Sequence, residues 1–228
     1  MSKSSETTLE QIYHELASER QQEAIEKIVE FGRQLVSQGH LELLSLIESV
    51  TIDRLEASLM APMMQLQGDI LLMLGRFEQA SSIFETASKA AKEANLPVVY
   101  SEILGSQADI AMKQGQTDKA LSSHKEALEV QVELGDAEGA ARTYNNMGYL
   151  YRRKNDRAKA LEAYSEVEAI ISSDESLLSA QIILGRALLD LGEVERARKH
   201  AFEVFERTDK ADDLLAHARA QALLGRYP

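Results

Sequence analysis

The chain has 228 residues, a formal net charge of −12 and no cysteine. The lack of cysteine excludes disulfides, thiolate metal sites and a cysteine nucleophile, and the acidic balance argues against binding to nucleic-acid phosphates, which requires Lys and Arg. No apolar run approaches the roughly 20 residues that span a bilayer, and the polar start has no apolar signal core. We therefore expect a cytoplasmic protein with neither a nucleic-acid nor a membrane partner.

The first predicted element is a helix within residues 1–19. Apolar residues recur there at the spacing of one helix face, over residues 7–18. This helix would act as an N-terminal cap, because the first unit of a repeat array exposes an uncovered end. Its expected apolar face consists of Leu9, Ile12, Tyr13 and Leu16.

Residues 20–208 repeat one pattern, in which a helical stripe of apolar and small residues is followed by a turn residue and a second stripe. The turn residue is glycine in every copy but one, where it is asparagine. Glycine, and less readily asparagine, tolerates the left-handed backbone that closes a helix. The near-constant spacing predicts a helical-repeat array with helices of about 17 residues. The predicted turns lie near Gly39, Gly75, Gly115, Asn155 and Gly192, and a further copy of the turn falls at Gly225.

The clearest copy covers residues 141–167, ARTYNNMGYLYRRKNDRAKALEAYSEV. Its stripes consist of Tyr144, Met147, Gly148 and Tyr151, then Ala160, Tyr164 and Val167. This pattern resembles the tetratricopeptide repeat family, in its subtype of about 40 residues per repeat that occurs in spindle-polarity adaptors and peptide-sensing regulators. The resemblance implies an all-α fold, a right-handed α-solenoid of about 12 helices in antiparallel pairs. It also implies that Gly148 lies where the two helices of its repeat cross closely, facing Ala160 or its neighbours.

The last segment, residues 209–228, predicts one more helix. Two interpretations stay open for it. It is either a C-terminal capping helix or the first half of a repeat that the chain truncates.

The sequence contains no motif of a phosphate-binding loop, a dinucleotide fold, a zinc protease or a serine hydrolase. The five histidines lie far apart in sequence, and helix packing explains His124 and His200 better than metal binding does. We therefore expect no catalytic residues, no metal and no cofactor, and the protein is not expected to be an enzyme.

The resemblance implies that partners bind the first helix of each repeat, on the concave face. In the amino-terminal half these positions are mostly acidic, whereas the carboxy-terminal half carries five arginines against one aspartate. Arginine binds carboxylates in bidentate geometry, and family members use asparagines of this helix to hold an extended peptide. We expect an acidic partner segment or a terminal carboxylate. The predicted contacts are Arg142, Asn145, Asn146, Tyr149, Arg152, Arg153, Arg186, Arg219, Lys113 and Asp109.

The favoured function is therefore a non-enzymatic protein-interaction scaffold that binds a peptide or helix of a partner in its concave groove. One alternative is a ligand- or peptide-sensing regulatory domain. Another is a self-assembling homo-oligomer, formed through an uncapped end of the array or through an apolar groove section. That section would consist of Leu66, Leu72, Ile182 and Ile183.

Overall fold

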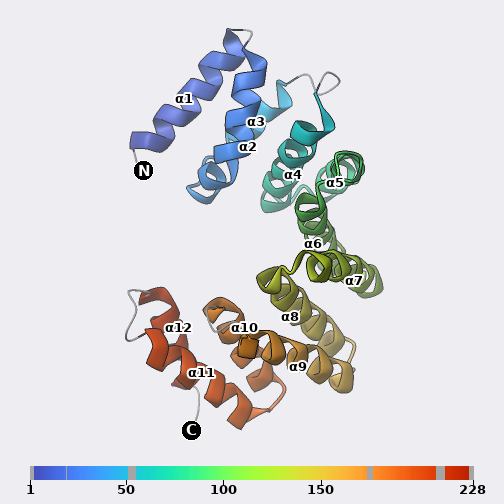
Figure 1. Ribbon diagram of the computed structural model, residues 1–228, viewed down its shortest axis with the longest axis vertical. Helices are drawn as coiled ribbons and strands as arrows, with labels where there is room; N and C mark the ends of the chain where they lie inside the picture. Colours follow the sequence, from blue (N-terminus) through green and yellow to red (C-terminus); the bar gives the residue numbers. More distant parts are fainter. Residues whose placement is uncertain (1–2, 19, 51–54, 174–176, 209–213, 226–228) are drawn as a thin grey trace. The chain divides into compact units, whose positions relative to one another are not determined.

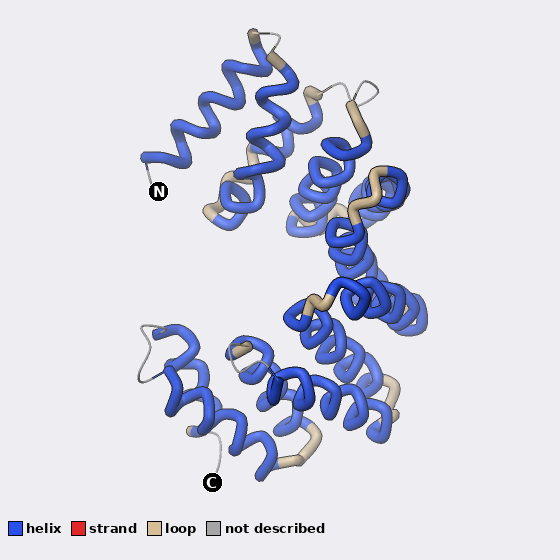
Figure 2. Tube along the Cα trace, viewed as in Figure 1, coloured by secondary structure: helices blue, strands red, loops and turns tan. Residues whose placement is uncertain are grey.

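The computed structural model describes residues 3–18, 20–50, 55–173, 177–208 and 214–225. Within these ranges the chain forms helices joined by short loops and contains no strand (Figures 1 and 2). The predicted all-α fold class is therefore confirmed.

The chain divides into two compact units, Met1–Lys113 and Gln114–Pro228. Most full-length helices have 17 residues, which is the length that the repeat spacing predicts. The first unit contains α1 (Lys3–Ala17), α2 (Gln21–Ser37), α3 (Leu43–Glu48), α4 (Ala57–Met73), α5 (Phe77–Glu93) and α6 (Pro97–Lys113). The second contains α7 (Thr117–Leu134), α8 (Ala137–Arg153), α9 (Arg157–Ser173), α10 (Leu178–Asp190), α11 (Val194–Thr208) and α12 (Leu214–Leu224).

Within each unit, consecutive helices pack as hairpins. In the first unit α4 packs against α5, and in the second α8 packs against α9 and α10 against α11. The first helices of successive repeats also lie next to one another. In the first unit α2 contacts α4 and α4 contacts α6, and in the second α8 contacts α10 and α10 contacts α12. This stacking of helix pairs is the α-solenoid arrangement. The right-handed twist of the array stays a prediction.

The turns between paired helices depend on residues with a left-handed backbone. Positive φ angles at Gly39 (94°), Gly75 (73°), Gly115 (75°), Asn155 (58°) and Gly192 (78°) confirm the predicted turns. The prediction for Gly225 is wrong, because its φ lies outside the left-handed region and its N–H donates to the Gln221 carbonyl at 3.0 Å, which extends the hydrogen bonding of α12. Two further left-handed residues, Asn95 and Gly135, follow α5 and α7. The repeat spacing had not revealed them.

Asn155 provides a direct test of this turn chemistry. Replacing it with alanine is expected to destabilise the protein by about 1 kcal/mol, because a left-handed backbone brings Cβ too close to the following carbonyl oxygen. Replacing it with glycine is expected to leave stability unchanged or raise it slightly. Urea unfolding of the two variants checks this, and equal stabilities would show that the left-handed conformation does not matter there.

Close crossings occur between paired helices, at glycines in the middle of the first helix. A Cβ atom built on Gly148 would lie 2.3 Å from Cε1 of Tyr164 on α9, and one built on Gly68 would lie 2.5 Å from Cε1 of Phe84 on α5. Both rings are buried almost completely. The predicted close crossing at Gly148 is therefore confirmed. Its partner is the ring of Tyr164, one helical turn beyond Ala160.

The amino-terminal helix α1 differs from the prediction in its bounds and its face. It begins at Lys3, and it packs against α2 and α3. Ile12 is fully buried as expected, but Tyr13 is 59% exposed and does not belong to the buried face. Glu15 lies on that face instead, 6% exposed, where Lys27 of α2 pairs with it. An ion pair therefore occupies a position that the apolar pattern did not predict.

The carboxy-terminal helix α12 packs against α10 and α11. The rest of the predicted terminal segment, residues 209–213 and 226–228, lies outside the described residues. The capping roles of α1 and α12 stay predictions.

Candidate interaction surfaces

The surface of α8 that the sequence singles out forms a stripe along one helix. Asp136 caps the amino terminus of α8, where its carboxylate accepts a hydrogen bond from the Gly139 N–H at 2.9 Å. Beyond this cap, Arg142 and Tyr149 are exposed, and Asn146 is half-buried. These positions are separated by four and three residues, so helix geometry puts them on the same face.

The end of α8 places two arginines around one aromatic ring. The guanidinium carbons of Arg152 and Arg153 lie 5.3 and 6.0 Å from the centroid of the Tyr149 ring, which is cation–π geometry. Arg152 also donates to Oδ2 of Asp190 on α10 at 2.8 Å. This ion pair joins the ends of two neighbouring first helices and leaves the charge of Arg152 partly neutralised.

Asn145 does not lie on the accessible stripe. Its side chain is only 4% exposed, and neither its oxygen nor its nitrogen has a hydrogen-bond partner among the described residues. Ala141 and Gly148, four residues before it and three after it, are also buried. Helix geometry therefore puts Asn145 on the packed face of α8, beneath the predicted contact surface.

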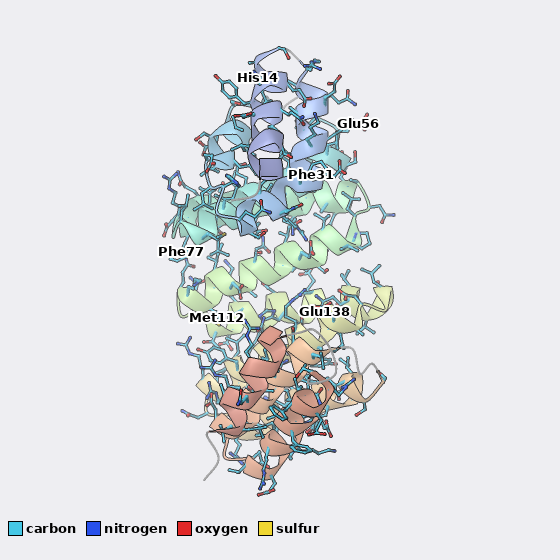
Figure 3. The ribbon with its side chains drawn as sticks, turned by 90° about the vertical axis from the view of Figure 1, so that its left-hand side faces the viewer. His14, Phe31, Glu56, Phe77, Met112 and Glu138 are labelled. Carbon is cyan, nitrogen blue, oxygen red and sulfur yellow. The ribbon has the colours of Figure 1, made fainter. Side chains whose placement is uncertain are left out.

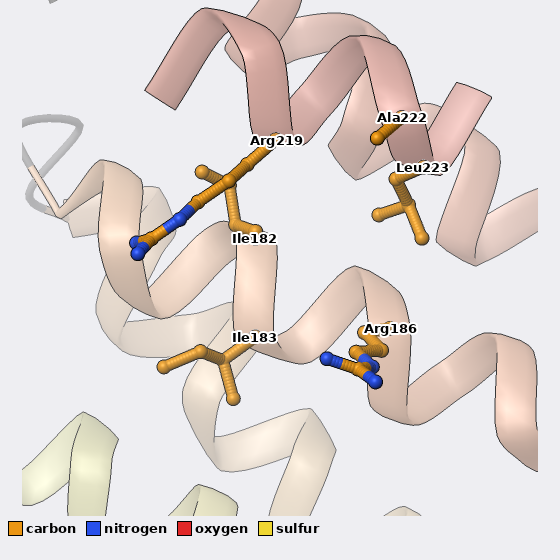
Figure 4. Close-up of a pocket in the computed structure, with 6 residues that line it drawn as sticks. All are labelled: Ile182, Ile183, Arg186, Arg219, Ala222 and Leu223. Atoms are coloured by element: carbon orange, nitrogen blue, oxygen red, sulfur yellow. The ribbon is translucent and has the colours of Figure 1, made fainter. Parts of the chain in front are cut away.

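Arg186 and Arg219 come together at one pocket. They project from α10 and α12 and line a pocket of about 400 Å³ in the second unit (Figure 4). Ile182 and Ile183, which were predicted as part of an apolar groove section, line the same pocket. Leu66 of the first unit is only 5% exposed, so its inclusion in an accessible apolar section was wrong.

The corresponding face of the first unit is acidic and internally bonded. Arg33 of α2 makes a bidentate ion pair with Glu102 of α6, and the Gln65 amide of α4 donates to the same carboxylate at 3.0 Å. Ser106 of α6 donates to Oδ1 of Asp69 on α4 at 2.9 Å. These bonds cross from helix to helix, so the face forms a polar network over α2, α4 and α6.

Burial dominates the electrostatics of this network. Burial is the main cause that raises the pKa of Asp69 to about 6; the charges of Glu102 and Asp109 act in the same direction, whereas the Ser106 hydrogen bond and Arg33 oppose it. The hydrogen bond with Glu102 raises the pKa of Arg33 above its usual value. The first unit therefore holds a carboxyl group that titrates just below neutral pH.

Lys113, at the end of α6, packs its ammonium 6.0 Å from the centroid of the Phe77 ring. Phe77 and Met112, both labelled in Figure 3, are half-buried at the start of α5 and near the end of α6. Asp109 and Lys113 thus lie on the first unit. The other eight predicted contact residues lie on the second.

The histidines take part in packing and hydrogen bonding. His124 is buried, and burial lowers its pKa to about 4. His200 on α11 bonds through Nε2 to Glu168 of α9 at 3.0 Å, and Arg196 donates to the same carboxylate at 2.7 Å. Sequence periodicity carries no signal for this network, because its members come from two helices and are 28 to 32 residues apart.

Over the described residues, no cluster of three or more histidine, aspartate or glutamate side chains has the arrangement to hold a metal ion. No helix among those residues combines the length and the apolar character that crossing a membrane requires.

Repeated hairpins with left-handed turns define this chain as a helical-repeat protein. Residues 100–173 match the family model of the tetratricopeptide repeat. A search of curated protein sequences finds no match. Together with the fold, this match over about a third of the chain supports the resemblance to the tetratricopeptide repeat family seen in the sequence.

Solved structures of the same fold include several proteins of low sequence identity. A signal transduction ATPase with a tetratricopeptide repeat sensor, PH0952 from Pyrococcus horikoshii, has a TM-score of 0.71 at 14% identity, covering 90% of this chain and 32% of that one. The Rap conjugation gene regulator of plasmid pLS20, solved with the Phr* peptide, has a TM-score of 0.64 at 18% identity, covering 100% and 61%. YrrB, described as having an unusual peptide-binding site, has a TM-score of 0.51 at 17% identity, covering 90% and 96%. These likenesses show the fold.

Proposed function

We propose that this protein is a non-enzymatic interaction module that binds an acidic segment of a partner protein on the first helices of its second unit. The observation that carries the proposal is a set of arginines on α8, α10 and α12 with no carboxylate partner among the described residues. The chain has 37 acidic and 25 basic residues, so internal partners are abundant. Arginines that remain unpaired on this surface favour an external carboxylate. The set consists of Arg142, Arg153, Arg186 and Arg219.

Three other arginines of the second unit each form an ion pair with a carboxylate of the same unit. Arg152 pairs with Asp190, Arg157 with Glu193 and Arg196 with Glu168. Two of these pairs join different helices, and Arg157 of α9 reaches the turn that precedes α11, so each pair links separate segments of the stack. The unpaired arginines make no such link, which supports a role in binding.

The neighbouring side chains suit a peptide. Tyr149 offers a rigid aromatic surface of the kind enriched at binding hot spots, and the Asn146 amide can donate to and accept from a peptide backbone. The unbonded amide of Asn145 lies on the adjacent packed face, where a buried polar group without a partner costs about 1–3 kcal/mol. A peptide group that reached Asn145 would recover part of that cost.

The fold comparison is consistent with this function. Two similar structures, the Rap regulator with its Phr* peptide and YrrB with its peptide-binding site, are described as peptide-binding proteins. The predicted roles of Asp109 and Lys113, which lie on the first unit, stay predictions apart from this surface. A cytoplasmic location is part of the same proposal.

The test uses a synthetic pool of random decapeptides, selected on the immobilised protein and identified by mass spectrometry. We expect acidic peptides to be enriched. In calorimetric titrations, Arg142→Ala/Arg153→Ala is expected to bind the best peptide about tenfold more weakly than the parent, and with a flatter salt dependence, because exposed charges act through screened Coulomb attraction.

The matched control is Lys125→Ala/Arg198→Ala, which removes two exposed positive charges from the second helices α7 and α11 of the same unit. It is expected to retain the parent affinity. Enrichment without an acidic bias, or equal losses in the two double variants, would contradict the proposed surface.

A further inference from the structure

A second groove of the second unit lies on the side of α8 that faces away from the unpaired arginines. Tyr144, Met147 and Tyr151 line it, at the spacing of one helix face. Tyr144 follows Arg142 by two residues, which corresponds to about 200° around the helix. The groove is therefore a different surface from the one to which the proposed function belongs.

The groove consists of two adjoining pockets, which share Tyr144 and Glu166. The tyrosine pocket, of about 250 Å³, is lined by α8 and α9, and the aliphatic pocket, of about 280 Å³, also has a wall from α7. Both volumes lie below the roughly 300–1,000 Å³ of pockets that hold drug-sized ligands. Two small adjoining pockets suit two side chains of one polypeptide segment better than they suit one small molecule.

The tyrosine pocket presents aromatic rings beside carboxylates. Tyr144 and Tyr151 are half-buried and pack against the core around α9, which fixes their rings. Glu162 and Glu166, one helical turn apart on α9, are exposed, and neither has an ion-pair partner within the part of the chain that the structure describes. Burial, and then the charge of Glu166, raises the pKa of Tyr144 above its usual value, so the carboxylate acts on the ring.

One cation of the chain already uses this aromatic surface. Nζ of Lys159 lies 5.7 Å from the centroid of the Tyr151 ring, which is cation–π geometry. The same ammonium lies 3.3 Å from Oδ2 of Asp156, which neutralises it. Glu162 and Glu166 therefore give the pocket an excess of negative charge next to aromatic rings. A guanidinium suits both features, because it stacks on aromatic faces and binds carboxylates in bidentate geometry.

The aliphatic pocket continues the groove towards α7. Val132 of α7 is 62% exposed, and Ile170 of α9 is half-buried. The wall from α7 is held in place by a buried hydrogen bond, in which Oγ1 of Thr143 on α8 donates to Oε1 of Gln131 at 2.8 Å. An exposed valine on a fixed wall offers a contact surface for an aliphatic side chain.

We propose that this groove binds a segment of a partner protein that carries an arginine close to an aliphatic residue. The guanidinium enters the tyrosine pocket and pairs with Glu162 and Glu166, and the aliphatic side chain enters the aliphatic pocket. Charge complementarity favours this occupant, because an acidic segment would meet two unpaired carboxylates and an apolar one would desolvate them without a partner. The inference goes beyond the proposed function, since it gives the second unit a separate surface for a basic segment.

The experiment compares two pools of random decapeptides with blocked ends and a fixed central residue, which is arginine in one pool and its uncharged analogue citrulline in the other. Both are selected on the immobilised full chain at about 0.15 M salt, where a Debye length of about 8 Å screens the long-range attraction of a chain of net charge −12 for any cation. We expect enrichment of arginine peptides with an aliphatic residue beside the arginine. The best of them is expected to bind about tenfold more tightly than its citrulline counterpart.

Variants then locate the effect. Glu162→Gln/Glu166→Gln keeps the side-chain size and is expected to remove the difference between arginine and citrulline peptides. Val132→Ser is expected to remove the preference for an aliphatic neighbour and to retain the preference for arginine. The matched control is Glu195→Gln/Glu206→Gln, which removes two exposed carboxylates from α11 and is expected to keep both preferences. Thermal unfolding of each variant confirms that the fold is intact.

The outcomes separate this groove from the arginine surface of the proposed function. Arg142→Ala/Arg153→Ala is expected to bind the arginine peptide as the parent does, and a loss in this variant would overturn the inference. Equal binding of arginine and citrulline peptides, or equal losses in the two double glutamate variants, would also overturn it and leave the proposed function in place. Sedimentation of the parent tests a second copy as the occupant. A dimer that Glu162→Gln/Glu166→Gln dissociates would assign the groove to self-association instead.

Discussion

Replacing Gly148 with leucine is expected to destabilise the protein by about 3 kcal/mol or more, the upper range for overpacking a well-filled core. The reason is geometric, since even the first added carbon would lie 2.3 Å from the Tyr164 ring. The ring is 1% exposed and packs in a core with Ala160 and Val167 of the same helix, so it has little room to move. Gly148→Ala is expected to show the same effect at about 1–3 kcal/mol. Urea unfolding measures both changes.

Gly105→Ala is the matched control for this prediction. Gly105 is also a helical glycine, in the middle of α6, but a Cβ atom there meets nothing within 4 Å. The alanine variant is therefore expected to be unchanged, or more stable by about 0.5–1 kcal/mol through its helix propensity. Equal effects at Gly105 and Gly148 would show that the crossing with Tyr164 does not determine the cost.

A second variant identifies the atoms responsible. Tyr164→Leu removes the ring that the new Cβ would meet, so the double variant Gly148→Ala/Tyr164→Leu is expected to be more stable than the sum of the two single changes predicts. Additive effects in this cycle would place the clash at another contact.

The repeat turns could be predicted from the sequence because they depend on one residue each. A left-handed backbone nearly requires glycine or asparagine, and the near-constant interval between such residues separates them from ordinary loop glycines. The same reasoning failed at Gly225, whose φ lies outside the left-handed region. It also did not reveal Asn95 and Gly135, which end second helices and have no counterpart in every repeat.

The candidate surfaces could be predicted only in part. Helix periodicity indicated the face that carries Arg186 and Arg219, and the structure brings these two arginines to one pocket. It did not separate Asn145 from Asn146, because adjacent residues differ by about 100° around the helix and the edge of the packed face falls between them. The ion pair of Arg33 with Glu102, 69 residues apart, also had no signal, because single-sequence periodicity carries no information about which distant side chains meet.

Asp69→Asn is expected to change the pH dependence of stability. An ordinary aspartate has a pKa of 3.8, whereas burial and neighbouring carboxylates raise the pKa of Asp69 to about 6. Because the folded-state value is the higher one, the stability that protonated Asp69 contributes is fully present below about pH 4 and is lost as the pH rises through about 6. A shift of this size corresponds to about 2–3 kcal/mol. Asparagine cannot ionise, and its oxygen can still accept the Ser106 hydrogen bond.

Urea unfolding between pH 4 and 7.5 therefore should show Asp69→Asn gaining stability relative to the parent as the pH rises, with most of the gain complete at pH 7.5. Glu30→Gln is the control. It removes one carboxylate from an exposed position on α2, so it changes the net charge by the same amount without removing a buried carboxyl group. A constant difference between Asp69→Asn and the parent over this range would show that Asp69 is ionised at little cost. The polar network of α2, α4 and α6 would then have to solvate the carboxylate better than its burial and its neighbours Glu102 and Asp109 indicate.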